Sequence, residues 1–272
     1  MKKSLALVLT LVLIATLCLA LTACGNTGSD VARIKEKGTL VVGITLYKPM
    51  DWLDEDTGEW TGFDADMANK LGEELGVTVQ FVVIKWANKV TELKSNNIDC
   101  IWNGMTMTDE LDQNIDFSCS YAENRQVAVV KTSDLATYNS VDAIKNAKVA
   151  VELKSAGDTQ ATETLQAATI NRVDDQVSAL TEVVAGTSDV ALIDYTMAKS
   201  VVGNGVYEGL SIVDIQTVSF GQEEFAVGVR TGSDLAQEIN TLFKKMYADG
   251  TMQALAQKYG GIVLNDAALA RV

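Results

Sequence analysis

The sequence predicts an α/β protein built as two lobes. Two observations indicate this fold: apolar strand-like segments alternate with amphipathic helix-like segments, and the alternation falls into two separate groups along the chain. The chain has 272 residues, of which 47% are hydrophobic, and this is enough to bury the cores of two modest domains. Strand-helix alternation at these lengths predicts parallel sheets, with ligands at the carboxyl ends of the strands.

The first group opens with a strand, a hairpin and a helix. Residues 39–45 are an apolar run that predicts a buried strand, and turn-forming residues within 52–60 predict a hairpin. A helix is predicted over 64–75, because apolar residues recur at helical spacing as far as Leu75 and Gly76 follows as a stop signal.

The remaining elements follow the same rhythm. Short apolar or period-two runs predict strands at 77–83, 98–102, 148–151, near Ile170 and at 190–193. Amphipathic spacing predicts helices at 88–95, 157–168, 176–185, 195–202, 234–247 and 252–259. No internal repeat or low-complexity linker separates the two groups, so the division into lobes depends on the elements themselves.

The N-terminal segment has the layout of an export signal. Lys2 and Lys3 precede an uncharged, apolar stretch that ends at Ala23, and a retained transmembrane anchor is the alternative for a stretch of this length. The ending Leu-Thr-Ala-Cys at 21–24 resembles the lipobox of bacterial lipoproteins. That resemblance implies a signal peptide at 1–23, a diacylglycerol on the thiol of Cys24, a tether over 24–30, and a place on the extracytoplasmic face of the bacterial membrane.

Charge and composition exclude several function classes. The chain carries 22 basic and 36 acidic side chains, and a surface of net charge −14 repels nucleic acid and anionic membranes. Histidine is absent, which excludes nucleophile triads with histidine and zinc sites with histidine. No metal site, cofactor or nucleic-acid partner is therefore predicted. Any catalysis would depend on carboxylates, Lys, Tyr or Cys.

The cysteines of the mature chain are few. Cys18 leaves with the predicted signal and Cys24 takes the lipid, so Cys100 and Cys119 remain. Cys100 lies in an apolar run and is interpreted as a core residue. A disulfide between Cys100 and Cys119 is the minority alternative for an exported protein.

Eight short motifs, taken together and in order, carry a resemblance to a known family. They are GTLVVG (38–43), GFDADMA (62–68), LKSNNID (93–99), NGMTMT (103–108), DFS (116–118), DVALID (189–194), EFAVGVR (224–230) and ADGT (248–251). With these motifs in this order, the chain resembles the polar amino-acid binding proteins of ABC importers, which are the family 3 bacterial extracellular solute-binding lipoproteins.

The resemblance implies a two-lobed, periplasmic-binding-protein-like fold of type II. Its two hinge crossings would lie near 118–123 and 219–223 and would let the lobes close on a ligand. Lobe 1 would then comprise 31–120 and 222–272, and lobe 2 would comprise 121–221.

The same resemblance assigns ligand-binding positions in lobe 1. Tyr47 and Trp86 fall where the family places aromatic walls around the ligand, although packing is the alternative for each. Gly104 and Thr106 lie in the loop whose backbone and hydroxyl would take polar atoms of the ligand.

Lobe 2 supplies two further candidate positions. Ser155 and Ala156 stand between a strand and a helix, where backbone N–H groups suit a carboxylate, and an ordinary helix N-cap is the nearly equal alternative. Asp194 follows an apolar strand and matches the family's partner for the ligand ammonium, with helix capping as its alternative.

One position departs from the family pattern. An arginine that binds the ligand carboxylate is usual there, and this chain has Leu111, which has no charge to offer. Either another cation serves, with Arg125 the first candidate and Lys154 the second, or the ligand is not a plain α-amino acid.

Three function classes remain. The leading one is a monomeric binding protein, not an enzyme, that captures a polar amino acid or a close derivative and delivers it to an ABC permease. The second is an enzyme on the same scaffold, similar to the dehydratase of cyclic dienyl acids, for which Glu223, Glu224 and Asp194 are the available acids. The third is a ligand-sensing surface module that signals through another protein.

Overall fold

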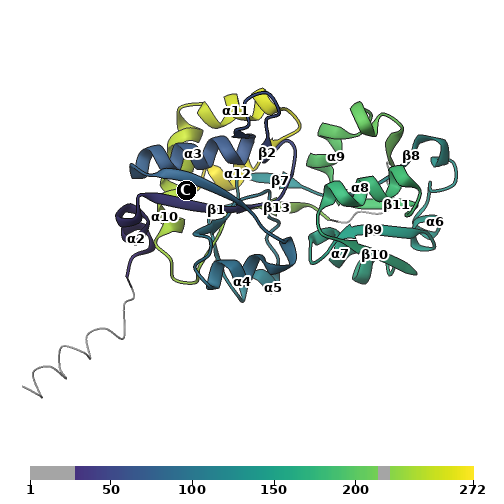
Figure 1. The fold of residues 1–272 in the computed structure, drawn as a ribbon, viewed down its shortest axis with the longest axis horizontal. Helices are drawn as coiled ribbons and strands as arrows, with labels where there is room; N and C mark the ends of the chain where they lie inside the picture. The colour runs from purple at the N-terminus through teal and green to yellow at the C-terminus, as the bar shows by residue number, and fades with distance from the viewer. Residues whose placement is uncertain (1–27, 214–220) are drawn as a thin grey trace, which may run out of the picture.

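The computed structural model describes residues 28–213 and 221–272, and within them the chain forms two lobes that two strands connect (Figure 1). Each lobe is built on a five-stranded sheet with helices around it, so the predicted two-lobed α/β fold with two crossings is confirmed. The predicted signal 1–23, Cys24 and the segment 214–220, which includes the first two residues of the second crossing, lie outside the described residues.

The sheet of the first lobe has the order β4-β1-β5-β14-β6. Its strands are β1 (Thr39–Ile44), β4 (Thr78–Val83), β5 (Cys100–Ile101), β6 (Asp116–Phe117) and β14 (Gly228–Val229). Side chains alternate across β1: Leu40, Val42 and Ile44 join the main core cluster, whereas Val41 joins a second cluster with Trp86. The strand is therefore apolar on both faces because helices cover both.

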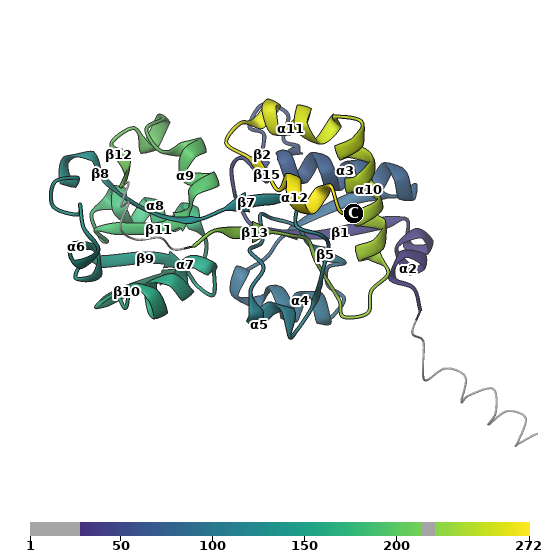
Figure 2. The same cartoon turned by 180° about the vertical axis from the view of Figure 1, so that it is seen from behind.

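Helices of the first lobe pack on the two faces of this sheet (Figures 1 and 2). They are α2 (Asp30–Lys37), α3 (Phe63–Leu75), the 3₁₀ turn η2 (Trp86–Asn88), α4 (Lys89–Lys94), α5 (Asp109–Asp112), α10 (Leu235–Ala248), α11 (Thr251–Tyr259) and α12 (Asp266–Leu269). The buried face of α3 carries Met67, Ala68, Leu71 and Leu75, and Gly76 ends the helix at φ 73°, as the sequence predicted. The expected hairpin is formed by β2 (Trp52–Leu53) and β3 (Trp60–Thr61).

The sheet of the second lobe has the order β10-β9-β11-β8-β12. Its strands are β8 (Gln126–Lys131), β9 (Lys148–Glu152), β10 (Thr169–Val173), β11 (Val190–Asp194) and β12 (Leu210–Val213). The helical elements around it are η3 (Thr132–Asp134), α6 (Val141–Lys145), α7 (Ala156–Thr159), η4 (Gln160–Thr164), α8 (Gln176–Ala185), α9 (Tyr195–Val201) and η5 (Gly205–Tyr207).

Both sheets are mixed, which corrects the expectation of parallel sheets. In the second lobe β10, β9 and β11 run parallel, but β8 is antiparallel to β11 and to β12. In the first lobe β14 is antiparallel to β5 and β6. The reversed strands β8 and β14 are the ones that enter a sheet directly from the other lobe, so the crossings set their direction.

The two crossings lie side by side between the lobes. Strand β7 (Ala122–Asn124) pairs antiparallel with β13 (Glu223–Phe225) and, on its other side, with β15 (Val263–Leu264). Figure 2 shows β7 and β13 running between the lobes. Backbone pairing therefore joins the two crossings to each other.

One local expectation changes, and one is confirmed. The helix predicted over 157–168 is shorter and irregular: α7 gives way to the π-helical turn η4, and the helical segment ends at Thr164. Cys100 and Cys119 are both free thiols, and burial raises the pKa of the Cys119 thiol to about 11. Cys100 is fully buried, as expected for a core residue.

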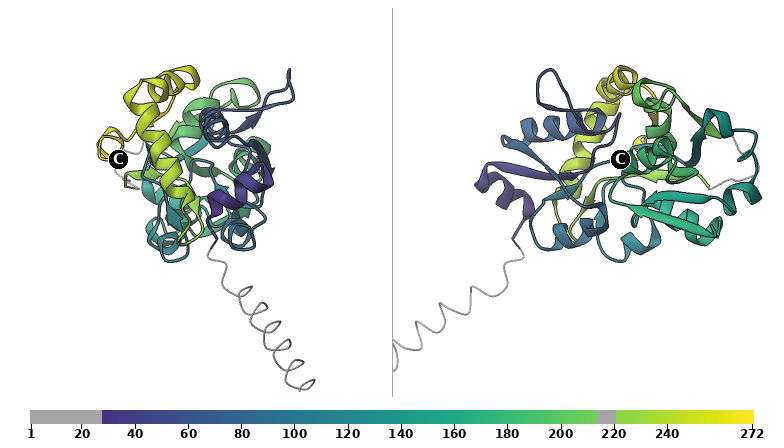
Figure 3. Two further views of the ribbon diagram at one scale, coloured as in Figure 1. Left: turned by 90° about the vertical axis from the view of Figure 1, so that its left-hand side faces the viewer. Right: turned by 45° about the vertical axis from the view of Figure 1, so that its right-hand side comes forward.

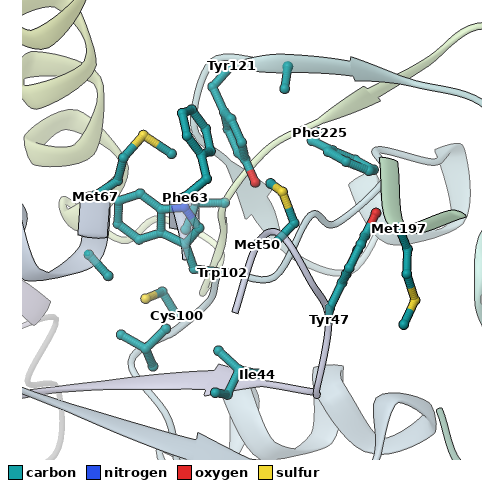
Figure 4. Packing of buried hydrophobic residues seen from close by; sticks show 14 of the residues in the cluster. Ile44, Tyr47, Met50, Phe63, Met67, Cys100, Trp102, Tyr121, Met197 and Phe225 are labelled. Carbon is teal, nitrogen blue, oxygen red and sulfur yellow. The ribbon is translucent and has the colours of Figure 1, made fainter. Parts of the chain in front are cut away.

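The main core contains side chains from both lobes. Figure 4 shows Tyr47, Tyr121 and Phe225 of this cluster with Met197, which comes from α9 of the second lobe. Helix α2 lies at the end of the first lobe that is farthest from the second (Figures 1 and 3). Among the described residues, no helix has the length and apolar character needed to cross a membrane.

Candidate functional site

A cavity of about 420 Å³ lies between the lobes. Seven of the eight expected binding residues line it: Tyr47, Trp86, Gly104, Thr106, Ser155, Ala156 and Asp194. These residues follow or end strands of both sheets, where ligands bind in α/β proteins. The described residues contain no group of three acidic or cysteine side chains that could hold a metal ion.

Tyr47 forms an aromatic wall from the first lobe. It follows β1, is 2% exposed, and packs edge-on against Phe225 with 6.4 Å between the ring centroids. The residue lines the cavity, and its buried hydroxyl is directed toward Asp194. Burial and the nearby charge of Asp194 raise the pKa of this phenol, so it is a neutral donor at physiological pH.

Trp86 forms a second aromatic wall together with a lysine that the sequence analysis missed. The indole is buried in η2 and packs on the second core cluster. Lys89, one turn later, is 5% exposed, and its Nζ lies 4.6 Å from the centroid of the Trp86 ring. Burial lowers the pKa of Lys89 to about 8. The lysine is therefore a desolvated cation on the cavity wall.

Lys89 also connects the lobes. Its Nζ donates to the backbone oxygen of Lys154, at 3.0 Å, and approaches that of Trp86 at 3.4 Å. An ammonium group has three N–H donors, so one remains for a further acceptor in the cavity. The sequence does contain a signal for Lys89. It lies three residues after Trp86, and in a helical turn this spacing puts the two side chains on one face.

The backbone N–H of Gly104 is already paired within the first lobe. The N–H donates to Asp64 Oδ2 at 2.6 Å. The glycine is required for space instead: its φ is 53°, and a Cβ there would lie 2.8 Å from Cε1 of Tyr47. The hydroxyl of Thr106 donates to Glu223 Oε2 at 3.1 Å, so it ties the loop to the hinge.

Buried carboxylates support the loop from inside the first lobe. Asp64 accepts hydrogen bonds from Gly104 N and, at 2.8 Å, from the Tyr121 hydroxyl. Burial nevertheless raises the pKa of Asp64 to about 7. Asp51 accepts from Nδ2 of Asn103 at 2.7 Å, and burial and the charge of Asp64 raise its pKa as well.

Asp194 is held by three side-chain amides. Asn124 Nδ2 and Gln126 Nε2 each donate to its Oδ1 at 2.6 Å, and Gln176 Nε2 donates to its Oδ2. Although Asp194 precedes α9, its side chain makes no capping hydrogen bond, so the capping alternative is wrong. Burial raises the pKa of Asp194, and the amide donors oppose that rise. The amides fix a carboxylate at the edge of the cavity.

Glu223 shares two of these amides. Asn124 Nδ2 and Gln126 Nε2 each lie 2.9 Å from its Oε2. Burial and the charge of Asp194 raise the pKa of Glu223 to about 7. Glu223 is on the hinge strand β13 and is not among the residues that line the cavity.

Ser155 is a helix N-cap. Its Oγ accepts from the backbone N–H of Asp158 at 3.1 Å, which confirms the capping alternative for its side chain. Lys154 lines the cavity beside it. Arg172 also lines the cavity, but its Nε is paired with Asp158 at 2.9 Å.

Glu152 is the second residue that the sequence analysis missed. It ends β9 as Asp194 ends β11, is 2% exposed, and lines the cavity. Glu152 and Asp194 are both charged residues at the carboxyl end of a buried strand. This pattern is visible in the sequence and indicates a ligand-binding position.

Arg125 does not reach the cavity. Asn124 and Gln126 point inward to Asp194, so the intervening Arg125 points to the opposite side. Its guanidinium stacks on the ring of Tyr195, 3.7 Å from the centroid, beside a separate pocket. Leu111 lines the main cavity, and Arg125 cannot replace the arginine that is missing there.

The family model of the bacterial extracellular solute-binding proteins, family 3, matches residues 40–262. The chain belongs to this family. The L-cystine-binding protein TcyJ of Escherichia coli K12 is 30% identical over 231 residues, which cover 84% of this chain and 85% of that protein. The crystal structure of an ABC uptake transporter substrate binding protein from Streptococcus pneumoniae with bound histidine matches with a TM-score of 0.79 and 28% identity. That match covers 89% of this chain and 100% of the other.

A family relative with a different activity is the cyclohexadienyl dehydratase of Pseudomonas aeruginosa. It is 28% identical over 191 residues, which cover 68% of this chain and 71% of that protein. The family description and the longer match to TcyJ are those of solute-binding proteins. The chain is accordingly a binding protein rather than an enzyme.

Proposed function

We propose that this protein binds a polar amino acid, or a close derivative, between its lobes and delivers it to an ABC permease. The observation that carries the proposal is Asp194, a buried carboxylate that three amides hold at the cavity and that does not cap its helix. A carboxylate in this state suits a ligand ammonium, because a buried charge needs an opposite charge. Relatives that bind cystine and histidine support the ligand class.

Each side of the cavity has a part in this proposal. Tyr47 and Trp86 flank the body of the ligand, and the Tyr47 hydroxyl supports Asp194 from the first lobe. The ligand carboxylate needs a cation, because Leu111 stands where the family has arginine. Lys89 is the buried cation with a remaining N–H donor, so we assign this role to Lys89.

The enzyme alternative rests on one observation, the near-neutral pKa of Glu223. A pKa near 7 suits a general acid. Glu223 is directed to Thr106 and the hinge amides, however, and it does not line the cavity. A group that cannot touch the ligand cannot transfer a proton to it, so binding is the better proposal.

The cellular setting is also part of the proposal. We propose that the lobes comprise 31–120 with 222–272 and 121–221, and that they close on the ligand about β7 and β13. We further propose that the chain is cleaved before Cys24 and anchored through a lipid on that thiol, outside the cytoplasmic membrane. Replacement of Cys24 by Ser tests the anchor: incorporation of labelled fatty acid into the protein is expected to be lost.

The function is tested by calorimetry with the standard amino acids, cystine and a cyclohexadienyl carboxylic acid. We expect one class of amino acids to bind at one site per chain with micromolar or tighter affinity and with no product formed. Consumption of the cyclohexadienyl acid, or binding of neither amino acids nor cystine, contradicts the proposal. A thermal-shift screen identifies the class first, because a ligand that binds only the folded chain raises its midpoint.

A further inference from the structure

The cavity contains a second buried carboxylate that the proposed function does not use. Glu152 is 2% exposed and lines the cavity, and its Oε1 has no hydrogen-bond partner among the described residues. An unpartnered buried carboxylate oxygen costs folding free energy. A group outside the protein is therefore expected to satisfy it.

Glu152 and Asp194 end neighbouring parallel strands. Strands β9 and β11 pair in register from Val149 with Val190, so both carboxylates lie at the same edge of the second-lobe sheet. Their environments differ, because Asp194 accepts from three amides whereas Glu152 Oε1 accepts from none. Gln176 also donates to Glu152, but Oε1 of Glu152 stays unpaired among the described residues, whereas Asp194 has donors on both oxygens.

No cation of the described residues pairs with Glu152. Lys89 acts on it electrostatically, but the Lys89 ammonium is directed to backbone oxygens and to the Trp86 ring. Arg172 is paired with Asp158. The lining of the cavity has five acidic residues, Glu110, Glu152, Asp158, Glu163 and Asp194, against the three basic residues Lys89, Lys154 and Arg172. The excess of negative charge favours a cation.

We propose that Glu152 determines specificity by binding a second cationic group of the ligand, the side-chain ammonium or guanidinium of a basic amino acid or a derivative of one. The inference rests on the proposed function, in which Asp194 takes the α-ammonium. The two carboxylates then each bind one positive charge of the ligand. The aromatic walls cover the apolar carbons between the two charged groups.

Near-isosteric pairs of ligands test the proposal. Calorimetry on the full chain compares arginine with citrulline and lysine with norleucine, because each pair differs mainly in the side-chain charge. We expect the basic member of at least one pair to bind at least tenfold more tightly. Glu152→Gln is expected to abolish this preference and to change the affinity for the neutral member less than twofold.

Glu163→Gln is the matched control. It removes the same charge from the cavity lining, but Glu163 is exposed, so water and salt screen it. The preference for the basic ligand is expected to stay within twofold of the wild type. An equal loss in both variants would show a general field effect and would overturn the assignment to Glu152.

Folding is monitored through the melting temperature of the empty protein. Glu152→Gln is expected to leave it unchanged or to raise it, because a neutral amide is less costly to bury than an unpartnered carboxylate. A marked decrease would identify Glu152 as a structural residue and would overturn the proposal.

Proton exchange on binding separates the two ways in which Glu152 could act. Burial and the charges of Asp194 and Asp175 raise its pKa, and the charge of Lys89 and a hydrogen bond from Gln176 oppose that rise. A cation that binds ionised Glu152 therefore displaces a proton, and affinity rises with pH. Lys89, with a pKa of about 8, also exchanges protons, so the wild type is compared with Glu152→Gln. Proton uptake that is lost in Glu152→Gln would mean that neutral Glu152 donates to a ligand carboxylate, and the proposal would be wrong.

The outcomes also separate this inference from the proposed function. If neutral amino acids bind as tightly as basic ones, the function stands and the inference fails. If no amino acid binds but putrescine or cadaverine does, and Glu152→Gln abolishes that binding, the amino-acid proposal fails and the cation site stands. If none of these binds, both are overturned.

Discussion

The two walls of the cavity are built from different chemistry. The wall from the first lobe presents the aromatic faces of Tyr47 and Trp86, and its buried carboxylate Asp64 lies behind the wall with donors from its own lobe. The wall from the second lobe presents carboxylates to the cavity itself, at Asp194 and Glu152. Lys89 is the exception, a first-lobe cation that reaches across to the second lobe.

The two walls therefore recognise different properties of a ligand: the first-lobe wall its shape, and the second-lobe wall its charge. Aromatic walls accept many ligand bodies, because stacking depends little on chemical identity, whereas a buried carboxylate accepts only a complementary group. Substitutions in the first lobe should therefore change affinity broadly or change stability. Substitutions in the second lobe should decide which ligands bind.

The largest effect is expected for Asp194→Ala. Removal of one partner of a buried ion pair costs about 3 kcal/mol, so affinity for an amino acid should fall about 100-fold. Calorimetry measures the loss, and Asp142→Ala, an exposed carboxylate in the same lobe, is the charge-matched control. A loss of less than fivefold would show that the ammonium binds elsewhere.

The first-lobe carboxylate should affect stability instead. Because the pKa of Asp64 is about 7 when folded and near 4 when unfolded, the folded chain holds the proton more strongly. Between these values the unfolding free energy falls as pH rises, by up to about 1.4 kcal/mol per pH unit. In Asp64→Asn this contribution disappears, so the variant should gain stability relative to the wild type from pH 4 to pH 7.

Urea unfolding at several pH values measures this slope. Tyr121→Phe sharpens the test, because the Tyr121 hydroxyl donates to Asp64 and lowers its pKa. Without that donor the pH-dependent loss should extend above pH 7. Equal slopes in the wild type and Asp64→Asn would contradict the expected sign.

The smallest effect is expected for Trp86→Ala. Loss of one aromatic wall should weaken binding about tenfold for every ligand, which is about 1.4 kcal/mol. Trp86→Phe keeps a ring in place and should recover most of the affinity. A change in the ranking of ligands, rather than a uniform loss, would mean that the first lobe also sets specificity.

The resemblance to the family assigned the wall residues, and their positions at strand ends agree with that assignment. Tyr47, Trp86 and Asp194 each follow or end a strand, and parallel strands bring such positions to one edge of a sheet, where the structure places them. Arg125 failed because it was chosen for its charge, and strand alternation between Asn124 and Gln126 directs it away from the cavity.

Other features depend on contacts between distant segments. The Gly104 N–H is taken by Asp64, forty positions earlier, and no local pattern shows that pairing. The burial of Lys89 and Glu152, which are 5% and 2% exposed, is produced by tertiary packing and is not visible in the local sequence. Mixed strand directions likewise follow from where the crossings enter each sheet rather than from the strands themselves.

The shared amides have a consequence for how the protein can evolve. Asn124 and Gln126 lie on the path of the first crossing, and each donates to Asp194 and to Glu223 of the second crossing. A substitution that changes the amide donors of Asn124 or Gln126 therefore affects both the carboxylate of Asp194 and the contact with the second crossing. Selection on ligand preference at this point therefore also changes the balance between open and closed lobes, and the two traits cannot drift apart.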